Sequence, residues 1–198
     1  MRRYRAVLAI IAAAALSPAA ADAKTCAKKT TGTCTDANTG QAVKIADRAR
    51  TLRLKSVAVK IIAPHAVTRT LGPFSPDFPN EVATASGRYV TFAVRVTNRG
   101  NQPVDTILDL EFDLRLGRAL YDDSFKAENL IGAPSLINAG ENNTIQPGLS
   151  AAGYITFDVA RKRTALVRTS GNLLVDDESD KRIGIIRTYG GSSGDSVS

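Results

Sequence analysis

Apolar and polar residues alternate with a period of two in three segments of this chain, at 89–98, 108–116 and 154–159. This alternation is typical of half-buried antiparallel strands, with one face toward a core and the other toward solvent. The apolar positions are Val90, Phe92, Val94, Val96, Leu108, Leu110, Phe112, Leu114, Leu116, Ile155, Phe157 and Val159. We predict that they point into one core between two facing sheets, with residues such as Glu111 and Thr156 outside it.

Further strands are predicted at 52–62, 173–175 and 183–186. The first changes phase, which a bulge or bend near Lys55-Ser56 would explain. Turn-forming residues separate the strands at 98–103, 117–118 and 146–148, and two longer connections run over 64–87 and 126–143. Seven or eight short strands with this spacing predict an all-β, immunoglobulin-like, two-sheet antiparallel β-sandwich.

The first 23 residues have the features of a secretory signal peptide. Three arginines precede an uncharged apolar run at 6–16, and Ala21-Asp22-Ala23 supplies the small-x-small pattern that a signal peptidase recognises. The run is shorter than the roughly 20 apolar residues that span a bilayer. The residues before Cys26 do not form a lipobox. We therefore expect cleavage after Ala23 and secretion without a lipid anchor.

The rest of the chain divides into three parts. Residues 24–41 are rich in Lys, Thr and Gly and predict an irregular N-terminal extension, 42–189 hold the strand pattern, and 190–198 predict a flexible tail. None of them offers a transmembrane segment, so the mature protein is expected to be soluble.

The only two cysteines, Cys26 and Cys34, follow the predicted cleavage site. In an oxidising compartment an isolated pair at this spacing predicts a local disulfide. Such a bond would tether the extension rather than hold the core. Zinc binding is disfavoured because the spacing is not CxxC and the chain has one histidine.

Three stretches resemble the DUF4352 domain, a telokin-like, immunoglobulin-fold family of exported bacterial proteins and lipoproteins, related in fold to the mycobacterial antigen MPT63. They are 42–47 with 54–61, then 89–103 with its Val-x-Asn-x-x-x-x-Pro pattern, and 146–159 with its Pro-Gly and Gly-x-x-x-Phe patterns. The resemblance spans roughly residues 43–189. The family has no agreed catalytic activity, so the resemblance implies a fold and an exported protein but no mechanism.

No constellation in the sequence predicts catalysis, a cofactor or a metal. His65 stands alone in a loop without a nucleophile motif, and we expect it to be exposed. The acidic turn 176–180 has oxygen donors for calcium but lacks the spacing of an EF-hand, so a solvated hairpin turn is expected. The row Asp109, Glu111 and Asp113 is expected on a polar strand face, paired with Arg95 or Lys60.

Basic charge is the remaining candidate for function. Removal of the first 23 residues takes away three arginines and one aspartate, and lowers the formal net charge from +7 to +5. The densest basic run is Arg161-Lys162-Arg163, expected at a strand end, where it could meet an anionic polymer. Nucleic-acid binding is disfavoured, because tryptophan is absent and aromatic and basic residues do not interleave.

These observations predict a secreted, non-enzymatic binding module whose partner is an extracellular protein or a cell-envelope ligand, with the contact on its loops. The alternative is a structural protein held by charge to anionic wall polymers.

Overall fold

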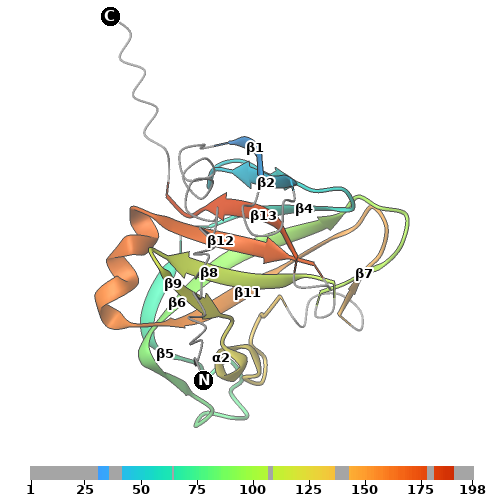
Figure 1. Ribbon diagram of the computed structural model, residues 1–198. Coiled ribbons are helices and arrows are strands. Elements are labelled where there is room, and N and C mark those ends of the chain that lie inside the picture. Colours follow the sequence, from blue (N-terminus) through green and yellow to red (C-terminus); the bar gives the residue numbers. More distant parts are fainter. Residues whose placement is uncertain are drawn as a thin grey trace, which may run out of the picture.

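The computed structural model describes residues 31–35, 42–63, 65–106, 109–136, 143–177 and 181–189. In this part of the chain two β-sheets lie face to face (Figure 1). The expected all-β sandwich is therefore confirmed. The predicted signal peptide, Cys26 and the predicted tail lie outside the described residues.

The first sheet has six strands in the order β1 (Gly32–Thr35), β2 (Ala42–Ala46), β13 (Arg182–Arg187), β12 (Gly171–Asp176), β8 (Glu111–Leu116) and β9 (Ala119–Asp122). All neighbours are antiparallel except β2 and β13, which run parallel. The second sheet has the order β11 (Ser150–Val159), β6 (Ala83–Asn98), β4 (Val57–Ile61) and β3 (Leu52–Arg53), and β5 (Ala66–Leu71) pairs with the first half of β6. Two short strands, β7 (Val104–Asp105) and β10 (Thr144–Ile145), pair with each other.

The core between the sheets holds the side chains that the alternation predicted. Every predicted inward position is buried except Leu108, which lies outside the described residues: Val90, Phe92, Val94, Val96, Leu110, Phe112, Leu114, Leu116, Ile155, Phe157 and Val159. The rings of Phe92 and Phe157 meet edge-to-face with their centroids 6.1 Å apart. The burial of all these core side chains supplies the main stabilisation of the sandwich.

The phase change near Lys55-Ser56 is a chain reversal. β3 and β4 pair antiparallel, and the backbone N–H of Leu54 donates to the carbonyl of Val57 at 2.8 Å. Leu52 and Val59 are consequently register partners, and both face the core. Of the two expected explanations, the bend is confirmed and the bulge is not, because a tight turn also exchanges the two parities.

Two segments that were expected to be irregular contain strands. The connection 64–87 includes β5 and the start of β6, and the N-terminal extension includes β1. Both are edge strands with few buried residues; β1 buries only Cys34. An edge strand without an apolar face gives no period-two signal, so alternation could not reveal either one.

The outer face of β6 is covered rather than solvated. The short helix α2 (Phe125–Glu128) and the residues after it pack on this face, where Ala83, Ala85, Tyr89, Ala127 and Leu130 form a second apolar cluster. Figure 1 shows α2 outside the sandwich, beside β5. The prediction of a fully polar, exposed outer face was therefore wrong for β6 and β11.

Asn98 explains the Val-x-Asn-x-x-x-x-Pro pattern in structural terms. Its fully buried amide Nδ2 donates to the carbonyls of Gln102 and Ile145 at 2.7 and 2.8 Å, and its Oδ1 accepts from the N–H of Gly100 at 2.9 Å. One side chain thus ties the end of β6 to its turn and to β10. Backbone groups buried at a turn need such partners.

Candidate functional site

A pocket of about 250 Å³ lies between the outer face of the second sheet and the segment that carries α2. Its floor consists of residues from β5, β6 and β11, and its roof of residues from α2 and 133–135. The described lining residues are Ala66, Leu71, Phe74, Thr91, Ala127, Glu128, Ala133, Pro134, Ser135, Tyr154 and Thr156. Concave, mostly apolar sites with a few placed polar groups are the usual form of small-molecule sites.

The polar groups of the pocket form one continuous chain. Glu128 accepts a hydrogen bond from the backbone N–H of Thr156 on Oε1 at 2.7 Å, and one from the hydroxyl of Ser135 on Oε2. The Thr156 hydroxyl lies 3.0 Å from that of Thr91, in a buried hydrogen bond. These hydrogen bonds thus join both parts of the roof, α2 and residues 133–135, to two strands of the floor.

Glu128 is only 3 % exposed. Burial is the main cause that raises the pKa of its carboxyl from 4.5 to about 8, the N–H of Thr156 lowers it, and the charge of Asp123 raises it further. At neutral pH the group therefore holds a proton. A neutral acid is tolerated here because both oxygens have hydrogen-bond partners.

The free edge of β11 positions the roof. The N–H of Tyr154 donates to the carbonyl of Pro134 at 2.8 Å, and its carbonyl accepts from the N–H of Leu136 at 2.9 Å. Two residues along, the carbonyl of Thr156 accepts from the N–H of Ser124 at 2.6 Å. The Glu128 carboxyl group accepts from the N–H of Thr156, as the carbonyl of a neighbouring strand would do.

Large apolar side chains remain exposed around α2 and the pocket. Phe74 and Tyr154 line the pocket and are 42 % and 44 % exposed, and Phe125 at the start of α2 is 78 % exposed. The backbone of Phe74 lies beside Gly132, next to the exposed Ile131. Apolar residues gathered at the mouth of a pocket mark an interaction site better than scattered ones.

Sequence reasoning missed this pocket. Its residues come from 66–74, 91, 127–135 and 154–156, and no short motif connects them. Thr156 is the one lining residue that the sequence placed in a clearly predicted strand, but its side chain was expected to face solvent. The structure buries it to 3 % exposure, because the Glu128 carboxyl and the Thr91 hydroxyl contact it.

The predicted basic run lies in a 3-10 helix, η1 (Arg161–Arg168), that directly follows β11. Arg161 and Lys162 are exposed, whereas Arg163 is half-buried and donates from Nη1 to the carbonyl of Leu116 at 3.1 Å. Arg168, at the end of η1, is exposed as well. None of the ion pairs between described residues includes these four side chains.

His65 is half-buried rather than exposed. Its ring lies 5.7 Å from that of Phe92, centroid to centroid, and its buried Nδ1 has no hydrogen-bond partner in the described part of the chain. Burial lowers the pKa of this histidine, and the charges of Arg168 and Arg48 lower it further.

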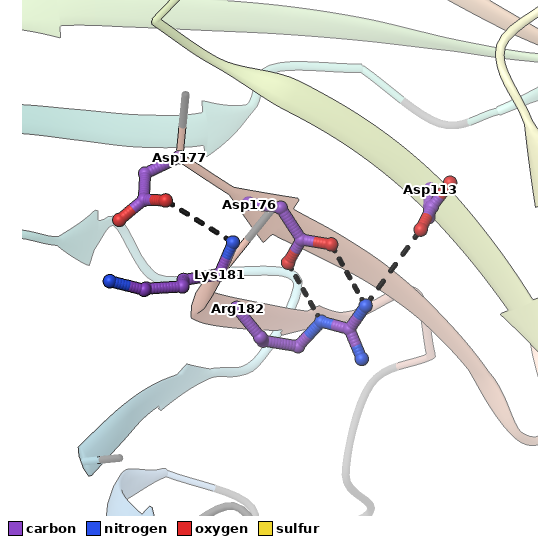
Figure 2. A network of polar contacts seen from close by, with 5 residues as sticks. All are labelled: Asp113, Asp176, Asp177, Lys181 and Arg182. Atoms are coloured by element: carbon purple, nitrogen blue, oxygen red, sulfur yellow. Dashed lines mark hydrogen bonds and ion pairs between the residues drawn. The ribbon is translucent and has the colours of Figure 1, made fainter. Parts of the chain in front are cut away.

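The acidic turn and the acidic row of β8 meet in one network, which Figure 2 shows. Arg182 donates from Nε and Nη2 to the two carboxylate oxygens of Asp176 at 2.9 Å each, and its Nη2 lies 3.7 Å from Asp113. Asp177 closes the turn by accepting from the backbone N–H of Lys181 at 3.2 Å. The remaining turn residues, 178–180, lie outside the described residues.

The expected pairing of Asp113 with Arg95 or Lys60 was wrong. Lys60 and Arg95 are register partners of each other in the second sheet, whereas Asp113 belongs to the first. Burial and the charge of Asp176 raise the pKa of Asp113 to about 6, and Arg182 opposes that shift. Because Arg182 of β13 pairs with Asp176 of β12 and lies near Asp113 of β8, the network cross-links three strands of the first sheet.

The described ranges contain neither a metal-binding cluster nor a membrane-spanning helix. No group of three or more His, Cys, Asp or Glu side chains there could hold a metal ion. No helix in the same ranges is long and apolar enough to cross a membrane. Cys34 is buried in a small cluster with Val43 and Ile45, and its predicted partner Cys26 lies outside the described residues, so the disulfide stays a prediction.

Comparisons with known proteins show no family for this chain. No family model matches the chain, and no curated protein matches it. Among solved structures it is similar to an uncharacterized β-sandwich protein from Clostridium difficile 630, with 10 % identity over 74 % of this chain and 96 % of that chain and a TM-score of 0.45.

Two further solved structures are similar at the same level. A functionally unknown protein from Listeria monocytogenes EGD-e has 17 % identity over 66 % of this chain and 72 % of that chain, with a TM-score of 0.46. The secreted protein MPT63 of Mycobacterium tuberculosis has 14 % identity over 72 % of this chain and 95 % of that chain, with a TM-score of 0.47. These likenesses say nothing about what this chain binds.

Proposed function

We propose that this chain is an exported, non-enzymatic binding module that takes a small molecule in the pocket beneath α2. One observation carries the proposal: an apolar pocket of about 250 Å³ is crossed by a single buried chain of polar groups from Ser135 through Glu128 and Thr156 to Thr91. The apolar walls would supply affinity, and the buried polar groups would orient the ligand.

Export is supported by the sequence alone. The arginine-led apolar run, the Ala21-Asp22-Ala23 pattern and the resemblance to the DUF4352 family all point to a secreted chain of the immunoglobulin-like class. We propose this membership and this location together, because they rest on the same residues.

The absence of enzymatic activity is part of the proposal. Catalysis by a serine needs a base within hydrogen-bond reach, and the hydroxyl of Ser135 pairs with Glu128, an acid that is protonated at neutral pH. The described lining of the pocket contains no histidine, cysteine or lysine. Binding is therefore the chemistry that this arrangement supports best.

A two-dimensional NMR titration with 1-hexanol tests the proposal. We expect the amide signals of Thr91, Ser135, Tyr154 and Thr156 to shift together, with saturation at one site. Ala133→Leu should abolish the shifts, because a larger side chain fills the pocket from its roof.

Ala119→Leu is the matched control, because Ala119 is half-buried on β9, in the other sheet, and does not line the pocket. This variant should bind 1-hexanol as the wild type does. Shifts that are scattered over the surface, or that survive Ala133→Leu, would refute a binding site in this pocket.

A second function is favoured by the exposed cations of η1. Arg161 and Lys162 would hold the protein to anionic wall polymers, which is a long-range attraction that salt screens. Retention on purified cell wall should then fall with salt, and Arg161→Ser/Lys162→Ser should weaken it more than Arg53→Ser/Lys55→Ser, which removes the same charge elsewhere. Salt-independent capture of one ligand would favour the pocket instead.

A further inference from the structure

We infer that the ligand of the pocket beneath α2 is a small molecule with a protonated amino group on an apolar body, and that Glu128 binds the ammonium. This inference rests on the proposed function, since it names the class of ligand for the same pocket. It follows from the acceptor groups, from the signs of the nearby charges and from the walls of the pocket.

The polar chain is rich in acceptors. A carboxylate offers about four lone-pair positions, and Glu128 uses one on each oxygen, for the N–H of Thr156 and the hydroxyl of Ser135. The hydroxyls of Thr91 and Thr156 share one hydrogen bond and keep further lone pairs. An ammonium group has three donors and no acceptor, which makes it the ionic group that fits such a set.

Acidic side chains are present on three segments that border the pocket. Asp123 precedes α2, Asp158 follows Thr156 on β11, and Glu81 accepts from the N–H of Ile131 at 2.8 Å beside the roof. Tyr89 of β6 packs against the same segment and has a raised pKa, so it stays neutral. The one cation of the helix, Lys126, is exposed.

No lysine, arginine or histidine is among the described lining residues, so the pocket contains a carboxyl group without an internal cation. Burial raises the pKa of Glu128 to about 8, and the empty pocket is therefore close to neutral at pH 7. An entering ammonium would favour the ionised carboxylate, and binding would release a proton from Glu128.

The walls suit the rest of such a molecule. Leu71, Ala127 and Ala133 offer apolar contact, and the rings of Phe74 and Tyr154 also line the pocket. Aromatic rings attract cations through their negative faces while they bury the apolar body. A carboxylate ligand, in contrast, would meet Glu128 without any compensating cation.

Isothermal titration at about pH 8 with hexylamine, 1-hexanol and hexanoate tests the inference on the full chain. At this pH the amine is still protonated, because alkylammonium groups have pKa values of about 10. We expect hexylamine to bind about tenfold or more tightly than 1-hexanol, as a charged hydrogen bond implies. Hexanoate should bind more weakly than both.

Glu128→Gln is the decisive variant. Its amide can accept from Thr156 and donate to Ser135, so the roof should stay in place while the charge is lost. We expect it to bind hexylamine and 1-hexanol within about twofold of each other. Glu111→Gln, the same exchange at an exposed position of β8 in the other sheet and outside the lining, should keep the wild-type preference.

A measurement on the wild-type protein is independent of any variant. The heat of hexylamine binding near pH 7 should depend on the ionisation heat of the buffer, because a proton leaves Glu128, whereas the heat of 1-hexanol binding should not.

The outcomes separate the two proposals. If 1-hexanol and hexylamine bind in the pocket equally well, the ammonium inference is overturned and the binding function stands. If neither compound shifts the signals of the pocket, both are overturned. A preference for the amine that survives in Glu128→Gln would place the ammonium elsewhere and also overturn the inference.

Discussion

Glu128 is a buried carboxyl group, and no cation is among the described residues that line its pocket. Removing a charge from water is costly, so such a group keeps its proton and gains hydrogen bonds instead. In this protein the partners are the backbone N–H of Thr156 and the hydroxyl of Ser135. The residue thereby links α2 and the roof of the pocket to the edge of β11.

The protonation of Glu128 predicts a pH-dependent stability. Its pKa is about 8 in the folded protein and about 4.5 when unfolded, so the folded state holds the proton more tightly. The stabilisation is complete below about pH 4.5 and is lost as the pH rises through 8. The unfolding free energy of Glu128→Gln should therefore be close to that of the wild type at pH 4.5. At pH 9 it should exceed that of the wild type by up to a few kcal/mol. Equal pH profiles in thermal melts would contradict this.

The core phenylalanines give a second prediction at this scale. Phe112 and Phe157 are buried between the sheets, and truncation of a buried Phe to Ala costs about 3–5 kcal/mol. Since small domains have about 5–15 kcal/mol in total, either variant should be marginal or unfolded in denaturant melts. Glu111→Ala, one position away and exposed, should change stability by less than about 0.5 kcal/mol. The reverse order would contradict the strand phase.

Thr156 is not a neutral control for these variants, although it alternates with Phe157. Its hydroxyl bonds to that of Thr91 in a buried position, so Thr156→Ala would leave a partner unsatisfied. A position's parity in a strand tells only which face it occupies. Whether that face is solvated depends on segments that the strand itself does not specify.

At the scale of elements, the sequence predicted those strands that carry an apolar face. β6, β8, β11, β12 and β13 all alternate and bury that face against the opposite sheet. β1 and β5 were missed because an edge strand with few buried residues shows no period of two. α2 has four residues, too few for a helical period.

Gly153 predicts how firmly the roof depends on β11. A Cβ at this position would lie 2.5 Å from the backbone nitrogen of Leu136, so Gly153→Ala must push the 134–136 segment away from the strand edge. We expect a loss of about 1–3 kcal/mol in unfolding free energy, typical of overpacking. Amide exchange should also rise at Tyr154, whose N–H donates to the carbonyl of Pro134, and at Leu136, whose N–H donates to the carbonyl of Tyr154.

Gly100→Ala is the matched control. A Cβ there would find its nearest neighbours at 3.4 Å, and the residue has no positive φ, so the exchange should be close to neutral. If Gly153→Ala were as harmless as Gly100→Ala, the roof would not depend on this close approach.

At the scale of the whole molecule, the sandwich follows from local patterns and the pocket does not. The two sheets form because apolar faces recur along the chain and must bury each other. The pocket exists because a helix-bearing segment between β9 and β10 folds back over the outer face of β6 and β11. Its residues are separated by up to 90 positions, and only the folded chain brings them together.

The mature protein itself provides the last prediction, which one measurement of intact mass can test. We expect secreted material to begin at Lys24, give or take a few residues, without lipid, because the signal peptidase pattern ends at Ala23 and no lipobox precedes Cys26.

The same spectrum should lie two mass units below that of the reduced protein, because Cys26 and Cys34 are expected to be paired. Cys34 lies in β1, at the edge of the first sheet, and outside the main core. Reduction should therefore lower stability only modestly, by roughly the 2–3 kcal/mol that closes a small loop. A retained Met1 or a lipid on Cys26 would contradict the export proposal. Free thiols in freshly secreted protein would contradict the disulfide. Global unfolding on reduction would contradict the peripheral role of that disulfide.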